Sequence, residues 1–171
     1  MLSCAVMSSS TDSVAESMLR AIGEALESID SVRIAYLFGS RARGTARPDS
    51  DLDLAIALSR GLGDTERGRI KLQIIDALTA ALGALGERTD IVDLDRAGPA
   101  VAFAAIAGGH CVFVRDCADR VRLEARIARR YDDERPHREL MRAAALRVSE
   151  RMKTGSHGCS RRAQSEAFDP Q

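Results

Sequence analysis

The stretch VRIAYLFGSRARGTARPDSDLDLAIAL, residues 32–58, contains two apolar segments joined by a polar connection. Residues 32–38 and 52–58 are rich in the apolar and branched side chains that favour β-strands, and Gly, Arg and Pro fill the connection. A loop between two strands is a frequent place for functional residues. The stretch therefore predicts two neighbouring strands with a candidate site between them.

Two acids, Asp51 and Asp53, stand at the start of the second strand. Residues i and i+2 of a strand share a face, so both carboxylates point to the same side. An isolated Asp-x-Asp is most often a solvated strand edge. Here the rest of the strand is apolar, and two like charges in a half-buried strand repel each other unless a cation offsets them. Magnesium, which prefers oxygen ligands, would do so.

A third carboxylate would complete a site for two metal ions, which in such enzymes lie about 3.5–4 Å apart. The segment TDIVDL, residues 89–94, predicts a third strand with two candidates. We expect Asp90 to be the ligand because it opens this strand beside the end of the sheet where Asp51 lies. Asp93 is the alternative ligand, although its strand parity is opposite to that of Asp90. Its ordinary interpretation is that of a solvated residue near the end of a strand.

The loop contains groups suited to a triphosphate. Gly39 lets the backbone approach closely, Ser40 offers a hydroxyl and an N–H, and Arg43 brings positive charge. A lone Gly-Ser carries no weight, and the signal is its coupling to the acids that follow after ten residues. We expect Arg41 and Arg47 mostly on the solvated surface of the loop.

The rest of the chain predicts further helices and short strands. A capping-box pattern opens an amphipathic helix at Ser13. Apolar residues recur at helical spacing over 65–82, and 99–107 suits a short helix before a strand at 111–114. Charged helices follow, with a break or a change of direction at the segment 132–136.

A chain of 171 residues, 45% hydrophobic and 29% charged, fits one globular domain. We expect this domain at 13–152, with a flexible N-terminus at 1–12 and a disordered tail at 153–171 that has no periodic apolar face. Lys plus Arg and Asp plus Glu both equal 25, which gives no reason to expect bulk binding to nucleic acid or membranes.

The four cysteines have no CxxC spacing and no paired histidines, so no zinc site is predicted and a reduced, cytoplasmic chain is the simplest interpretation. The first residues lack the basic region of a signal peptide. The uncharged stretch 97–114 is interrupted by Pro and Gly, which favours a short helix and a strand over a membrane span.

Gly39-Ser40, the ten residues after them and Asp51-Leu52-Asp53 resemble the GS-x10-DxD signature of polymerase-β-type nucleotidyltransferases. Over residues 32–135 the chain is similar to the minimal nucleotidyltransferase (MNT, MntA-like) antitoxins, which pair with HEPN-domain RNase toxins. The resemblance implies an α/β (α+β) polymerase-β-like nucleotidyltransferase fold, with a small mixed sheet, helices packed on one face and C-terminal helices.

The resemblance also implies an activity. Members of this family silence the toxin by transferring AMP from ATP to its tyrosine, with release of pyrophosphate. The implied ligands of the Mg2+ ions are Asp51, Asp53 and Asp90, and Asp90 would also help to activate the acceptor hydroxyl. Gly39 and Ser40 would hold the β- and γ-phosphates. The expected partners are the HEPN toxin and ATP, without membrane or direct nucleic-acid binding.

Two other functions compete with this one. The first is nucleotidyl transfer to a small molecule such as an aminoglycoside, for which relatives usually need an additional helical domain, and the chain after residue 114 leaves little room for one. The second is a non-catalytic antitoxin that masks a toxin through its helices. The intact motif residues argue against it: Gly39, Ser40, Asp51, Asp53 and Asp90.

Overall fold

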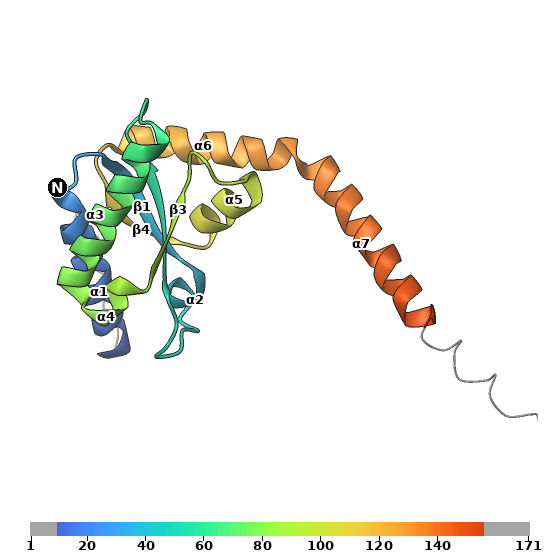
Figure 1. The fold of residues 1–171 in the computed structure, drawn as a ribbon, viewed down its shortest axis with the longest axis horizontal. Coiled ribbons are helices and arrows are strands. Elements are labelled where there is room, and N and C mark those ends of the chain that lie inside the picture. The colour runs from blue at the N-terminus through green and yellow to red at the C-terminus, as the bar shows by residue number, and fades with distance from the viewer. Residues whose placement is uncertain (1–9, 156–171) are drawn as a thin grey trace, which may run out of the picture. The chain divides into compact units, whose positions relative to one another are not determined.

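The structure is a computed structural model that describes residues 10–155. The chain divides after Tyr131 into two compact units, of which the first contains the sheet (Figure 1). The predicted ends, 1–12 and 153–171, lie outside the described residues except at 10–12 and 153–155, which are helical. The domain bounds 13–152 stay a prediction.

A four-stranded mixed sheet with the order β3-β2-β1-β4 forms the centre of the first unit. Strand β1 (Val32–Phe38) pairs antiparallel with β2 (Leu52–Leu58) and with β4 (His110–Val114). Strand β2 pairs parallel with β3 (Thr89–Asp93). The predicted mixed sheet is confirmed, and its parallel pair brings the starts of β2 and β3 to the same end of the sheet.

The helices within the described residues are α1 (Ser10–Glu27), α2 (Gly39–Ala42), α3 (Asp64–Leu82), α4 (Ala84–Glu87), α5 (Pro99–Ala107), α6 (Cys117–Asp133) and α7 (Arg135–Gly155). Of these, α2 and α4 are single turns and the other helices are longer. The predicted helices at 65–82 and 99–107 are confirmed, while α1 begins before the predicted Ser13. The single turn α2 lies within the connection that the sequence predicts as a loop. No helix within residues 10–155 combines the length and apolarity needed to cross a membrane.

Helices cover both faces of the sheet, so the predicted packing on one face is wrong (Figure 1). On one face, Ile22 of α1 and Ile74 of α3 share an apolar cluster with Leu54. On the other, α5 and α6 contribute Ala102 and Ile127 to a second cluster. The physical reason is that β1 and β2 are apolar at both strand parities, and a strand of this kind must be buried on two sides.

Candidate functional site

Asp53 is the point at which the two halves of the sequence motif meet. In the antiparallel pair it lies opposite Phe38, the last residue of β1, which Gly39 follows. In the parallel pair it lies opposite Asp90. Asp51 stands two residues earlier, just before β2 begins. The fold therefore places Asp53 and Asp90 side by side on neighbouring strands.

The charges around Asp53 oppose its ionisation. Burial raises the pKa of the Asp53 carboxyl, and the negative charges of Asp90 and then Asp51 raise this pKa further. The charge of Arg43 and a hydrogen bond from the backbone N–H of Ser40 act in the opposite direction. Three acids that repel one another at one end of a sheet form a site that a cation would stabilise.

Gly39 makes the closest backbone approach to these acids. Its φ of 75° lies in the left-handed region that favours glycine. A Cβ atom at this position would lie 1.8 Å from Oδ2 of Asp53, far inside contact distance. The residue opens α2, and the turn directs the next backbone N–H, that of Ser40, at the same carboxylate.

The acids fit a divalent cation by their chemistry. Asp51 and Asp90 are exposed, and Asp53 between them is half-buried. Within residues 10–155, no three His, Cys, Asp or Glu side chains are already grouped closely enough to hold a metal ion. Carboxylate oxygens are nevertheless the ligands that Mg2+ prefers, and its charge would offset the repulsion that raises the Asp53 pKa.

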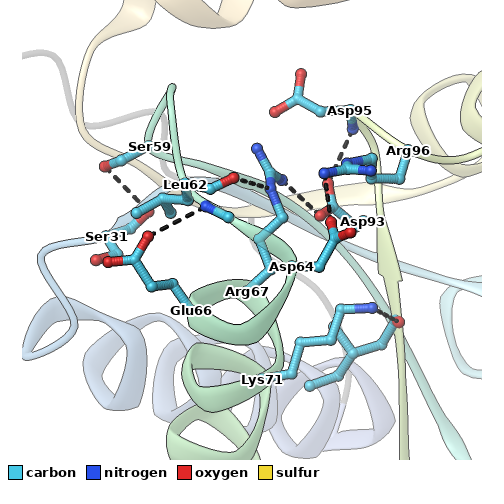
Figure 2. A network of polar contacts seen from close by, with 12 residues as sticks. Ser31, Ser59, Leu62, Asp64, Glu66, Arg67, Lys71, Asp93, Asp95 and Arg96 are labelled. Atoms are coloured by element: carbon cyan, nitrogen blue, oxygen red, sulfur yellow. Dashed lines mark hydrogen bonds and ion pairs between the residues drawn. The ribbon is translucent and has the colours of Figure 1, made fainter.

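Asp93, the alternative third ligand, is engaged elsewhere. It is buried and lies opposite Ile56, farther along β3 than Asp90. Its Oδ2 lies 2.6 Å from Nη1 of Arg67, and its Oδ1 accepts the backbone N–H of Asp95 at 3.0 Å (Figure 2). One oxygen therefore joins β3 to α3 and the other holds the turn after β3, which favours Asp90 as the third acid of the site.

Alanine substitutions of Asp93 and Asp90 distinguish a structural acid from an acid of the candidate site. Asp93→Ala should lower the free energy of unfolding by about 3–5 kcal/mol, because the buried guanidinium of Arg67 loses its partner. Asp90→Ala should change it by less than about 1 kcal/mol, since the side chain is exposed. Urea denaturation of both variants measures the difference, and equal losses would contradict the assignment.

Two arginines hold the loop between β1 and β2 in place. Arg41 of α2 donates hydrogen bonds to the backbone carbonyls of Ser50 and Asp51. From the other side, Arg88 donates to the carbonyls of residues 48–49 at 3.3 and 2.9 Å. Sequence reasoning missed this role of Arg41, because composition does not distinguish an arginine in water from one bound to backbone carbonyls. Arg41 ties the Gly-Ser turn directly to the first acid of the motif.

Removal of this tie should loosen the loop. Arg41→Ala loses both hydrogen bonds, so we expect faster proteolytic cleavage within residues 42–50 and a free energy of unfolding lower by about 1 kcal/mol. Arg47→Ala, at an exposed position of the same loop, is the control and should change neither quantity. Equal cleavage rates in the parent and in Arg41→Ala would show that the arginine does not hold the loop.

A family model described as Polymerase beta, Nucleotidyltransferase matches residues 20–118. This range includes the sheet and every candidate residue around Asp53. None of the curated protein sequences compared with the chain matches it.

Solved structures with a similar fold come from toxin–antitoxin complexes. One, a toxin–antitoxin with AMP-PNP, has a TM-score of 0.59 at 20% identity and covers 77% of this chain and 98% of its own. Another, the toxin–antitoxin MntA–HepT, has a TM-score of 0.54 at 18% identity, over 77% and 97%. A third, a tri-AMPylated Shewanella oneidensis HEPN toxin in complex with MNT antitoxin, has a TM-score of 0.54 at 17% identity, over 78% and 98%. At these identities the similarity shows the shared fold.

Proposed function

Because the chain belongs to the polymerase beta nucleotidyltransferase family, we propose that it is a Mg2+-dependent adenylyltransferase that acts as the antitoxin of a HEPN toxin. In this proposal it transfers AMP from ATP to a tyrosine of the HEPN RNase and releases pyrophosphate. The toxin–antitoxin structures with the same fold, one of which contains the ATP analogue AMP-PNP, support the choice of nucleotide and partner.

The observation that carries the proposal is the convergence of the motif on one carboxylate. Asp53 is within electrostatic reach of Asp51, Asp90 and Arg43, and it accepts a hydrogen bond from Ser40. These residues come from two strands, a helical turn and a loop, and a purely structural ion pair does not need three acids. A site for phosphates and their counterions does.

The residues around Asp53 have different roles in the proposed transfer. Asp51 and Asp53 would hold the metal, with Asp90 as the third ligand, and bound Mg2+ supplies positive charge to the phosphates. Ser40 and Arg43 would bind the β- and γ-phosphates, in a turn that the small Gly39 keeps close to the acids. Arg41 maintains the distance between this turn and Asp51.

The chemistry then requires no nucleophile from this chain. The phenolic oxygen of the acceptor attacks the α-phosphorus in line, and the bond from that phosphorus to the bridging oxygen of the β-phosphate breaks. Pyrophosphate leaves with the electron pair of that bond. Asp90 is exposed beside Asp53 and would accept the phenolic proton. Catalysis thus consists mainly of positioning and charge neutralisation.

The test combines the purified chain, ATP labelled at the α-phosphate, Mg2+ and the cognate HEPN protein. We expect label on a tyrosine of the HEPN protein, stoichiometric pyrophosphate, and loss of both with EDTA. No transfer with any nucleotide or divalent metal would overturn the proposal. Label on an aminoglycoside instead would assign the small-molecule reaction. Full toxin neutralisation by the Asp51→Ala, Asp53→Ala double variant at equal expression would assign non-catalytic masking.

A further inference from the structure

A second charged pocket lies at the opposite end of β1 from the candidate active site. Arg33 stands near the start of β1, whereas Phe38 at its end pairs with Asp53, a separation of about 16 Å along an extended strand. The pocket has a volume of about 490 Å³. It is lined by Arg33, Arg60, Arg115, Asp116, Asp119 and Arg122.

The pocket carries a local excess of positive charge. Four guanidinium groups face two carboxylates, a net charge of +2 in a chain whose total charge is zero. Asp119 is shared by Arg33 at 3.2 Å, Arg60 at 3.7 Å and Arg122 at 3.9 Å. The last two distances exceed hydrogen-bond length, and Arg122 donates instead to Asp116 at 3.3 Å. The two acids therefore leave donors of Arg60 and Arg122 available.

Arg33 enters the pocket at an irregularity of its strand. The pairing of β1 with β2 shifts by one residue between Val32 and Ile34, which makes Arg33 the extra residue of a β-bulge. Bulges re-aim side chains and occur often beside functional sites. The Arg33 side chain is 16% exposed, and its Nε is buried without a hydrogen-bond partner among the described residues. A buried Nε–H without a hydrogen-bond partner is unusual for an arginine in a purely structural role.

Arg115 makes one wall of the pocket rigid. Its Nε donates to the carbonyl of Val32 at 2.8 Å, and its Nη2 donates to the carbonyls of Glu27 and Ile29, both at 3.0 Å. These bonds use the donors of Nε and Nη2 for the backbone, and Nη2 also lies 3.7 Å from Oδ1 of Asp30, so Arg115 contributes charge and a fixed wall. The reachable donors are those of Arg60 and Arg122, whose side chains are 70% and 62% exposed.

We propose that this pocket binds a phosphate-bearing small molecule. Arg60 and Arg122 donate to the phosphate oxygens, and Arg33 contributes the charge at the base. The planar guanidinium matches phosphate geometry with paired hydrogen bonds. A doubly charged phosphate also balances the net charge of the lining residues. The site is independent of the proposed transfer reaction, because it uses neither the acids nor the Gly-Ser turn around Asp53.

Calorimetric titration of the full chain in metal-free chloride buffer tests this site, with inorganic phosphate, pyrophosphate and AMP as separate probes. We expect saturable binding of at least one probe, weakened tenfold or more in the Arg60→Gln, Arg122→Gln double variant. These exposed substitutions should leave the circular dichroism spectrum and thermal midpoint unchanged. Tighter binding of AMP than of phosphate would identify the ligand of the pocket as a nucleotide. Equal binding of the two would identify it as free phosphate.

Two controls locate the binding. Asp49→Asn removes an exposed acid and Arg47→Gln an exposed arginine, both outside the pocket, and each should bind the probes as the parent does. The proposal is overturned by the absence of saturable binding of all three probes to the parent chain. Parental affinity in the folded double variant, or loss of binding in Asp49→Asn or Arg47→Gln, overturns it as well.

Discussion

Asp53→Asn should lower the rate constant kcat of nucleotidyl transfer by at least about 10³-fold, with the fold intact. The substitution keeps the shape of the side chain but removes the charge at the centre of the site, where the metal would bind between Asp51 and Asp90. Single-turnover transfer of labelled AMP to the HEPN protein measures the loss.

The same variant should be more stable than the parent when no metal is present. The pKa of Asp53 is raised from the ordinary 3.8, so the folded state binds this proton more tightly than the unfolded chain does. Ionisation of Asp53 therefore costs stability above its raised pKa, and the cost disappears as the pH falls below 3.8. Denaturation in EDTA should show a gain for Asp53→Asn at pH 7 that vanishes on acidification.

A matched control tests whether the effects require the loss of the charge at Asp53 or of any acid in this loop. Asp49→Asn removes one exposed acid of the same loop that is not among the main causes of the raised Asp53 pKa, and it should retain both transfer and parental stability. Added Mg2+ should stabilise the parent and Asp49→Asn but not Asp53→Asn, because only a bound ligand shifts the unfolding equilibrium. Transfer by Asp53→Asn at the parental rate would refute the central role of this carboxylate.

Gly39→Ala should reduce transfer by about 10²-fold or more, because its new Cβ must displace the Asp53 carboxylate. The left-handed backbone conformation adds a cost of about 1–2 kcal/mol to the folded state. Both losses are measurable on one protein sample, by kinetics and by denaturation.

Gly44→Ala is the control for backbone strain alone. Gly44 has a φ of 68°, close to the 75° of Gly39, but a Cβ atom there would meet nothing within 4 Å. We expect a similar strain cost with transfer close to the parental rate. If the two alanine variants lose transfer equally, the close approach of Gly39 to Asp53 is not what the reaction requires.

Features determined within a few residues could be predicted from the sequence. Strands at 32–38 and 52–58 follow from runs of apolar residues, and the shared face of Asp51 and Asp53 follows from the strand period. The position of Asp90 at the same end of the sheet as Asp51 could also be anticipated, since Asp90 opens the third strand, but the register that pairs it with Asp53 could not. The actual engagement of Asp93 by Arg67 could not.

The sequence by itself thus determined which residues are the candidates for the site, because strand period and turn conformation are local properties of the chain. Tertiary structure alone decided what surrounds them. Helices return to both faces of the sheet, Arg41 reaches the carbonyl of Asp51, and Arg33, Arg60 and Arg115 gather from three strand ends into one pocket. Each of these contacts depends on how segments far apart in the chain pack together. A pattern within a few residues does not determine that packing.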